Sequence, residues 1–249
     1  MKTGLIIFAV LSLLLFRLSP AKGESKDTPI LLYHRFGPIA ADSMTVTTAV
    51  LDSQLKYLRG HGYEVIRLGQ LVDCYLGKNQ RLPSRSLVIT VDDGHKSVYT
   101  DLLPLLKKYR IPVTLFLYPS ALSNASYAMT WNQLREMKET GLLDYQAHTF
   151  WHPNFKIEKR RLKAAEYESL VEMQFRKSKE RLERELNVKV DMLAWPFGIY
   201  DEELVNKAIG TGYKAAFSMD RRHAGVSDNM MTLPRYLIGN GDNLSRYKL

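Results

Sequence analysis

Short apolar runs alternate with longer amphipathic segments along most of the chain. The runs are rich in β-branched and aromatic residues, a composition typical of buried strands. We expect strands at residues 30–33, 87–91, 113–118, 142–147, 192–195 and 215–218. The segments between them carry apolar residues at helical spacing, which predicts helices at residues 50–61, 98–109, 132–140, 162–186 and 202–211.

The alternation of strands and helices indicates the fold class. Parallel strands need a crossover connection, usually a helix, so the pattern predicts an α/β sheet or barrel. No internal repeat or linker divides the chain, and one folded domain of residues 24–249 is expected. Its longest helix, residues 162–186, has a single apolar stripe interrupted by Gln174 and Ser178. Such a stripe predicts a helix packed on a core rather than a coiled coil.

Residues 1–23 have the character of a signal peptide. A lysine precedes an apolar run over residues 5–16 that is too short to span a bilayer comfortably, and small residues follow where cleavage would occur. The alternative is an uncleaved anchor, which Arg17 directly after the run disfavours. We therefore expect residues 24–249 to be exported to the periplasm or the extracellular space.

Composition narrows the remaining choices. With 45% hydrophobic and 24% charged residues, the 249-residue chain is that of a folded protein, and we expect a monomer. The formal charge of +9 falls to +6 without the three basic residues of the predicted signal peptide, and this balance fits peripheral contact with an anionic envelope surface and does not call for a nucleic-acid partner. The basic run at residues 156–161 is expected to be a solvated face. The single cysteine, Cys74, excludes an intrachain disulfide, and we expect it to pack in a helix.

Two polar clusters follow separate predicted strands. Asp92 and Asp93 come directly after the run at residues 87–91, and His148 and His152 follow the run at 142–147. On its own, Asp-Asp-Gly is more often a turn, and a histidine pair four residues apart is a weak signal. Together they are informative, because the carboxyl ends of strands converge on the active site in α/β folds.

One aspartate and two histidines form the three-ligand pattern of a catalytic metal with a position left for water. The second aspartate can then act as the base that accepts a proton from that water. Zinc is the expected metal, and cobalt or iron would also suit these ligands. A third cluster, residues 194–201, places proline and glycine around an aromatic residue; it is either a structural turn or a loop whose N–H faces an oxyanion.

The three clusters, in this order, resemble the polysaccharide deacetylase (NodB-homology) family. Residues 90–94 match its T-F-D-D-G motif with valine at the second position, residues 148–152 match H-S/T-x-x-H, and residues 194–198 match R-x-P-x-G without its arginine. The resemblance extends from Leu31 to about Tyr236. It implies an irregular (β/α) barrel of about seven parallel strands.

The resemblance also implies roles for individual residues. Asp92 would be the base, and Phe197 would stabilise the oxyanion through its backbone N–H. The metal ligands would be Asp93, His148 and His152.

Two departures from the family pattern bear on catalysis. Ala194 stands where many members have an arginine that steadies the base, and the late L-x-H motif, whose histidine is the usual acid, is replaced by Leu233-Pro234-Arg235. We expect His34, at the end of the first strand, to be the general acid, against the alternative of a hydrogen-bonded strand-end histidine. Arg235 is a candidate to replace the missing arginine, and a surface salt bridge is an equal alternative.

The segment around His34 resembles the opening of exported deacetylases that act on poly-β-1,6-N-acetylglucosamine. The expected function is therefore metal-dependent hydrolysis of N-acetyl groups on N-acetylglucosamine residues of such a polysaccharide, with release of acetate. Peptidoglycan and chitin-like chains are alternative substrates. Two other classes stay open: an inactive carbohydrate-binding protein on the same fold, and a non-haem iron oxygenase, which also uses two histidines and a carboxylate.

Overall fold

The computed structural model describes residues 27–78, 81–242 and 244–247, so the predicted signal peptide lies outside the described residues. Ten strands are present in this part of the chain. They are β1 (Ile30–Tyr33), β2 (Arg35–Gly37), β3 (Thr45–Thr47), β4 (Glu64–Val65), β5 (Ser86–Asp93), β6 (Val113–Leu117), β7 (Leu143–Ala147), β8 (Met192–Ala194), β9 (Ala215–Phe217) and β10 (Tyr236–Leu237).

Seven parallel strands form the main sheet, in the order β10-β1-β5-β6-β7-β8-β9, with β4 beside the start of β5. The segment before β10 also reaches the opposite edge, because Leu233 forms a parallel bridge with Phe217 of β9. The sheet is therefore curled, and Phe116 of β6 meets Phe217 across its interior at 5.3 Å between ring centroids. The predicted (β/α) barrel of about seven parallel strands is confirmed.

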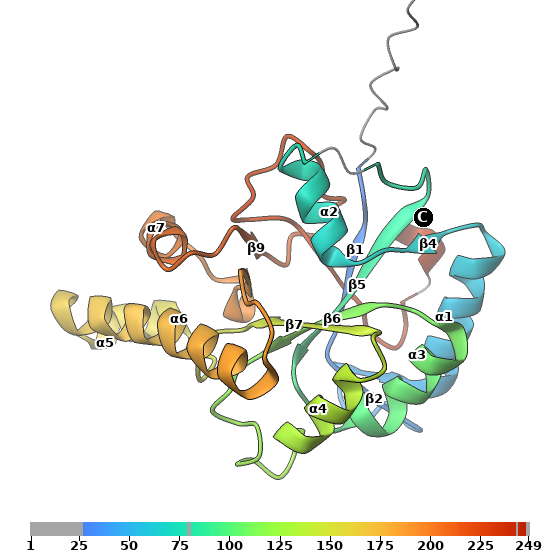
Figure 1. Cartoon of the computed structure of the whole chain (residues 1–249), viewed down its shortest axis with the longest axis horizontal. Helices are drawn as coiled ribbons and strands as arrows, with labels where there is room; N and C mark the ends of the chain where they lie inside the picture. Colours follow the sequence, from blue (N-terminus) through green and yellow to red (C-terminus); the bar gives the residue numbers. More distant parts are fainter. Residues whose placement is uncertain (1–26, 79–80, 243, 248–249) are drawn as a thin grey trace, which may run out of the picture.

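Helices surround this curled sheet (Figure 1). The α-helices are α1 (Thr48–Gly60), α2 (Leu68–Tyr75), α3 (Leu103–Tyr109), α4 (Trp131–Lys138), α5 (Phe155–Arg161), α6 (Ala164–Leu186) and α7 (Glu202–Gly210). Three short helices complete the described chain: a π-helical turn η1 (Val98–Leu102) and the 3₁₀ turns η2 (Pro196–Gly198) and η3 (Leu244–Tyr247).

Alternation along the strands divides the core into two clusters. Successive strand residues point to opposite faces, and one set, including Ile30, Val88 and Phe116, packs together with α2. The other set, including Leu31 and Ile89, packs beneath the remaining helices. Because both faces of the sheet are covered, the seven strands of the main sheet are largely apolar and have no exposed residue, as their composition predicted.

Most predicted helices are present, with two differences. The expected helix at residues 98–109 begins as the π-turn η1 before continuing as α3, and α5 is a separate helix before α6. Asn154 caps α5 by accepting a hydrogen bond from the N–H of Ile157, which gives this short segment its own start. In α6, Gln174 and Ser178 are fully buried, so the polar interruptions of the apolar stripe also face the core.

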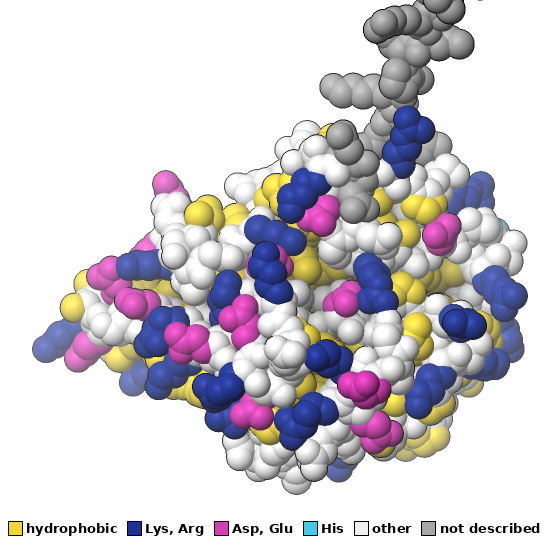
Figure 2. Space-filling model, viewed as in Figure 1, with side chains coloured by type: hydrophobic (Ala, Val, Ile, Leu, Met, Phe, Trp, Pro, Cys, Tyr) yellow, Lys and Arg dark blue, Asp and Glu magenta, His cyan; other side chains and the backbone are white. Residues whose placement is uncertain are grey.

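The described surface carries charges of both signs. In Figure 2, lysine and arginine side chains are spread over one face and interspersed with acidic ones, so this face has no large patch of a single sign. Several of the basic groups are paired, as in Lys159 with Asp201 and Glu203. Among the residues that the structure describes, no helix is both long and apolar enough to cross a membrane.

Candidate active site

The functional side chains come from the carboxyl ends of three strands of the main sheet, β1, β5 and β7. Asp92 and Asp93 are the last two residues of β5 rather than part of the loop after it. His148 follows β7 directly, and His34 follows β1. Parallel pairing of β1, β5, β6 and β7 brings these strand ends to one mouth of the barrel.

Asp93, His148 and His152 form a cluster with the dimensions of a metal site. The Asp93 Oδ1 atom lies 3.7 Å from Nε2 of His148 and 3.8 Å from Nε2 of His152, and one ligand atom from each residue lies within 4.8 Å of the others. Metal–ligand bonds of about 2.0–2.2 Å place tetrahedral ligand atoms about 3.3–3.6 Å apart. The three donors therefore fit a divalent cation.

The protonation of the two imidazoles also suits a metal. Burial lowers the pKa of His148 to about 3 and lowers that of His152, so both rings are neutral near pH 7. The Nδ1 atom of His148 lies 2.8 Å from the carbonyl oxygen of Ala194, to which it can donate only in one tautomer. That tautomer leaves the Nε2 lone pair facing Asp93, which is the form that binds metal.

Asp92 and Arg235 form a buried, bidentate ion pair. Both Nη atoms of Arg235 lie 2.8 Å from Asp92 oxygens, and the two side chains are 0% and 2% exposed. Burial, the largest single effect, would raise the pKa of Asp92, but the Arg235 guanidinium together with His148 and His34 holds that pKa below its usual range. The surface salt bridge considered for Arg235 is wrong, because the side chain is fully buried.

The position of Arg235 is fixed by further contacts inside the barrel. Its Nε donates to the carbonyl oxygen of Ser218 at 3.1 Å, and its guanidinium lies 5.3 Å from the centre of the Phe116 ring. The carboxylate of Asp92 thus faces Arg235 on one side, while its Oδ2 lies 3.8 Å from Nε2 of His148 on the other.

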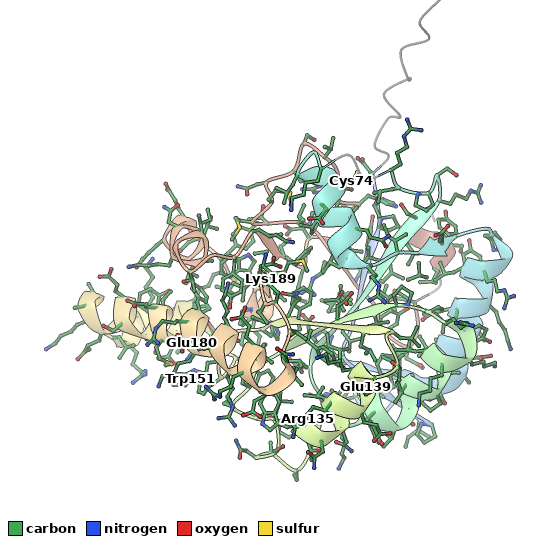
Figure 3. The ribbon with its side chains drawn as sticks, viewed as in Figure 1. Cys74, Arg135, Glu139, Trp151, Glu180 and Lys189 are labelled. Atoms are coloured by element: carbon green, nitrogen blue, oxygen red, sulfur yellow. The ribbon has the colours of Figure 1, made fainter. Side chains whose placement is uncertain are left out.

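The loop that carries His148 and His152 is held by a residue that sequence reasoning missed. The backbone N–H groups of Phe150 and Trp151 both donate to Oε1 of Gln174, each at 3.0 Å. Trp151 accordingly lies beside α6 (Figure 3). The only signal in the sequence was a polar residue within the apolar stripe of the long helix.

Phe197 lies against the histidine cluster in a left-handed backbone conformation. Its φ is 56°, and its ring centroid is 4.5 Å from that of His152. The next two amides donate to the carbonyls of Trp195 and Pro196, whereas the Phe197 N–H has no acceptor in the described part of the chain. The loop therefore presents one backbone donor close to the proposed metal ligands.

His34 and two tyrosines complete the surroundings. The Nδ1 atom of His34 is buried and has no hydrogen-bond partner among the described residues. This histidine is close enough to Asp93 to lower the pKa of that carboxyl, although burial, the larger effect, raises it overall. Tyr118 packs on His152 at 5.5 Å, and its hydroxyl lies 2.7 Å from that of Tyr127.

Comparison with known proteins agrees with this geometry. Residues 79–216 match the family described as polysaccharide deacetylase. Poly-beta-1,6-N-acetyl-D-glucosamine N-deacetylase of Escherichia coli K12 is 25% identical over 86% of this chain, which spans only 37% of that relative's length. The Staphylococcus aureus MRSA252 protein of the same name is 27% identical over 78% of this chain and 68% of its own length.

Solved structures share the fold. The Streptococcus pyogenes deacetylase PplD, solved in complex with acetate, superposes with a TM-score of 0.79 at 24% identity, covering 90% of this chain and 98% of that one. IcaB from Ammonifex degensii has a TM-score of 0.73 at 24% identity, covering 86% and 93% of the two chains.

Proposed function

Because the chain belongs to the polysaccharide deacetylase family, we propose that it hydrolyses the N-acetyl groups of N-acetylglucosamine residues in an extracytoplasmic polysaccharide and releases acetate. The observation that carries this proposal is the Asp93–His148–His152 cluster beside the buried Asp92–Arg235 pair. This arrangement offers a cation site and an ionised carboxylate at the same mouth of the barrel. Metal-dependent hydrolysis of an amide uses both functions.

Asp93, His148 and His152 would hold the divalent cation, and Zn²⁺ suits one carboxylate and two imidazoles best, with Co²⁺ or Fe²⁺ also compatible. When bound, such a cation supplies Lewis-acid chemistry, lowering the pKa of water and polarising an amide carbonyl. The carbonyl of Ala194 would keep the His148 ring in the ligating orientation.

Asp92 is the proposed general base, and Arg235 is the residue that positions it. A base must be unprotonated at the working pH, and the Arg235 guanidinium, with smaller contributions from His148 and His34, keeps the Asp92 carboxyl ionised despite its burial. The bidentate pairing also fixes the plane of the carboxylate. Arg235 thus takes the part of the arginine that Ala194 replaces in the sequence.

Phe197 and His34 supply the remaining proposed functions. The free N–H of Phe197 would donate to the oxygen that becomes negatively charged when the acetamide carbonyl is attacked. His34 would protonate the departing amine of the sugar as the C–N bond breaks. Its buried Nδ1 has no hydrogen-bond partner among the described residues, and the residue is close enough to Asp93 to lower the pKa of that carboxyl, which supports this role.

The proposed polymer is poly-β-1,6-N-acetylglucosamine, followed by peptidoglycan and chitin-like chains. The proposal draws on the segment around His34 and on the names of the Escherichia coli and Staphylococcus aureus relatives. The alternative of an inactive carbohydrate-binding protein rests on the missing arginine and the missing L-x-H motif, for which Arg235 and His34 are the proposed replacements. We also propose that residues 24–249 are exported and act as a monomer, with peripheral contact at an anionic envelope surface.

An acetate-release assay tests the proposed function. Zn²⁺-loaded protein is incubated with each of the three polymers, and released acetate is measured against Asp92→Asn as the matched control. We expect release from poly-β-1,6-N-acetylglucosamine above the other two and almost none from the control. Equal rates for the control and the wild type would refute the role of Asp92, and no release from any N-acetylated polymer would refute the proposed activity.

A further inference from the structure

The loop from His148 to His152 has an unfavourable backbone. Thr149 and His152 both lie in the left-handed region, with φ values of 62° and 64°, although neither is a glycine. Residues other than glycine disfavour this region because their Cβ atom is crowded there. Such a loop conformation therefore persists only where contacts with the surrounding protein stabilise it. The loop carries two of the three proposed metal ligands, and its conformation therefore decides where they point.

Two side-chain oxygens satisfy three successive amides of this loop. The N–H of His152 donates to Oγ1 of Thr149 at 3.1 Å, within the loop itself. The N–H groups of Phe150 and Trp151 both donate to Oε1 of Gln174, which projects from the middle of α6 and is 0% exposed. The Gln174 side chain thus connects the loop to the long helix α6, which packs on the protein core.

The positions of the two histidine rings depend on the Gln174 hydrogen bonds to different degrees. The His148 ring is anchored separately, through Nδ1 and the Ala194 carbonyl. The His152 ring has aromatic neighbours at 4.5–5.5 Å, namely Phe197, His148 and Tyr118, and its placement rests on the loop backbone. Without the Gln174 oxygen the two amides would lose their acceptor, and the loop would be held less firmly, by the bond that the Ser120 N–H donates to the Phe150 carbonyl at 3.0 Å. We therefore expect His152 to shift.

We propose that Gln174 is a positioning residue that sets the affinity of the Asp93–His148–His152 cluster for a divalent cation. This inference rests on the metal site of the proposed function. Gln174 touches neither the cation nor the substrate, and it acts through the backbone of residues 150 and 151. Residues that orient metal ligands in this way typically change metal affinity by about 10- to 100-fold when they are replaced.

The chain provides a matched control at Gln146 in β7. Its Oε1 accepts hydrogen bonds from the N–H groups of Asp191 and Met192, at 3.0 and 2.9 Å, and the side chain is 5% exposed. Gln146→Met therefore removes two backbone hydrogen bonds to one buried carboxamide oxygen, as Gln174→Met does, and also the 3.3 Å bond that Nε2 of Gln146 donates to the Lys189 carbonyl. Its bonds hold the segment that leads into β8 and do not involve the amides of the loop at residues 148–152.

Calorimetric titration with Zn²⁺ compares the wild type with Gln174→Met, Gln146→Met and Gln174→Glu. We expect Gln174→Met to bind Zn²⁺ about 10-fold or more weakly, and Gln146→Met to bind as the wild type does. Gln174→Glu keeps an oxygen acceptor for both amides, so its affinity should return to near the wild-type value even if its stability falls. Urea unfolding of the metal-free proteins should show that the two Met variants are similarly destabilised.

Wild-type affinity in Gln174→Met, or an equal loss in both Met variants, would overturn the inference. If a variant does not fold, hydrogen exchange of the wild type still decides, because the amides of Phe150 and Trp151 should exchange as slowly as those in the middle of α6. Fast exchange at these two amides would overturn it. A wild type that binds Zn²⁺ but releases no acetate refutes only the proposed activity, whereas one that binds no Zn²⁺ overturns the metal site and this inference together.

Discussion

Replacing Arg235 by methionine should destabilise the protein strongly. The substitution keeps the side-chain length within the barrel but removes both hydrogen bonds to Asp92, at 2.8 Å each, and the bond to Ser218. Removing one partner of a buried ion pair leaves the other charge uncompensated, which costs about 3–5 kcal/mol. Domains of this kind have total stabilities of about 5–15 kcal/mol, so the loss would be a large fraction of the whole.

Urea unfolding at pH 7, with a chelator present, measures the loss. Arg222→Met is the matched control, because Arg222 also pairs with a carboxylate through two 2.8 Å bonds, to Asp228, but its side chain is 55% exposed. Exposed pairs contribute about 0–1 kcal/mol. Similar losses in the two variants, or a loss below about 1 kcal/mol for Arg235→Met, would refute the assignment of a strong buried pair.

The pH dependence gives a second, independent sign. In the wild type the pKa of Asp92 lies below its ordinary value of 3.8, so the stabilisation from the pair is present above that pH and is lost as the pH falls through the folded-state pKa. Without Arg235, burial dominates and raises the pKa of Asp92, so the variant loses stability as the pH rises above 3.8. The difference between the two proteins should therefore grow from pH 4 to pH 7, and a constant difference would contradict this explanation.

Three further predictions concern the mouth of the barrel. His34→Ala should slow acetate release by about 100- to 10,000-fold while leaving Zn²⁺ binding unchanged, and a rate within a few-fold of the wild type would remove His34 from the mechanism. Phe197→Gly keeps the backbone N–H and suits the φ of 56°, so kcat should change by less than about 10-fold; a loss near 1,000-fold would assign the function to the ring instead. Gly94→Ala places a Cβ 2.9 Å from Leu117 Cδ2 at a φ of 84°, which should lower the free energy of unfolding by about 1–3 kcal/mol; an unchanged thermal midpoint would show that the loop adapts without cost.

Much of the fold and the site could be predicted from the sequence because the signals were local. A buried strand is recognisable in the sequence as an apolar run. Asp93 lies at the end of one such run, and His148 and His152 follow another. Strands β4 and β10 could not be found in this way, since two residues are too few to show a period. The separate start of α5 depends on a single cap, at Asn154.

Long-range partners set the limit of sequence reasoning. Arg235 was a candidate partner of Asp92, but only the return of the chain into the sheet beside β1 determines that it is buried and bidentate. Gln174 could not be recognised, because a polar residue within an apolar stripe is equally compatible with a solvated edge of the helix. Whether such a residue is buried or solvated depends on which loop packs against the helix, and the helix sequence does not contain that information.

The pairing of β1 with β10 has a consequence for how the molecule assembles. Leu31 and Tyr236 are partners in the sheet, so β1 and β10, the first and last strands of the part of the chain that the structure describes, pair only after all the segments between them are available. Pairings between such distant segments slow folding, because the chain entropy of closing the loop is lost before any contact is gained. Until β10 pairs with β1, Asp92 lacks its counter-ion Arg235. An intermediate formed by the earlier strands alone would therefore have an incomplete active site. We therefore expect activity to appear in the last kinetic phase of refolding, together with the final increment of structure.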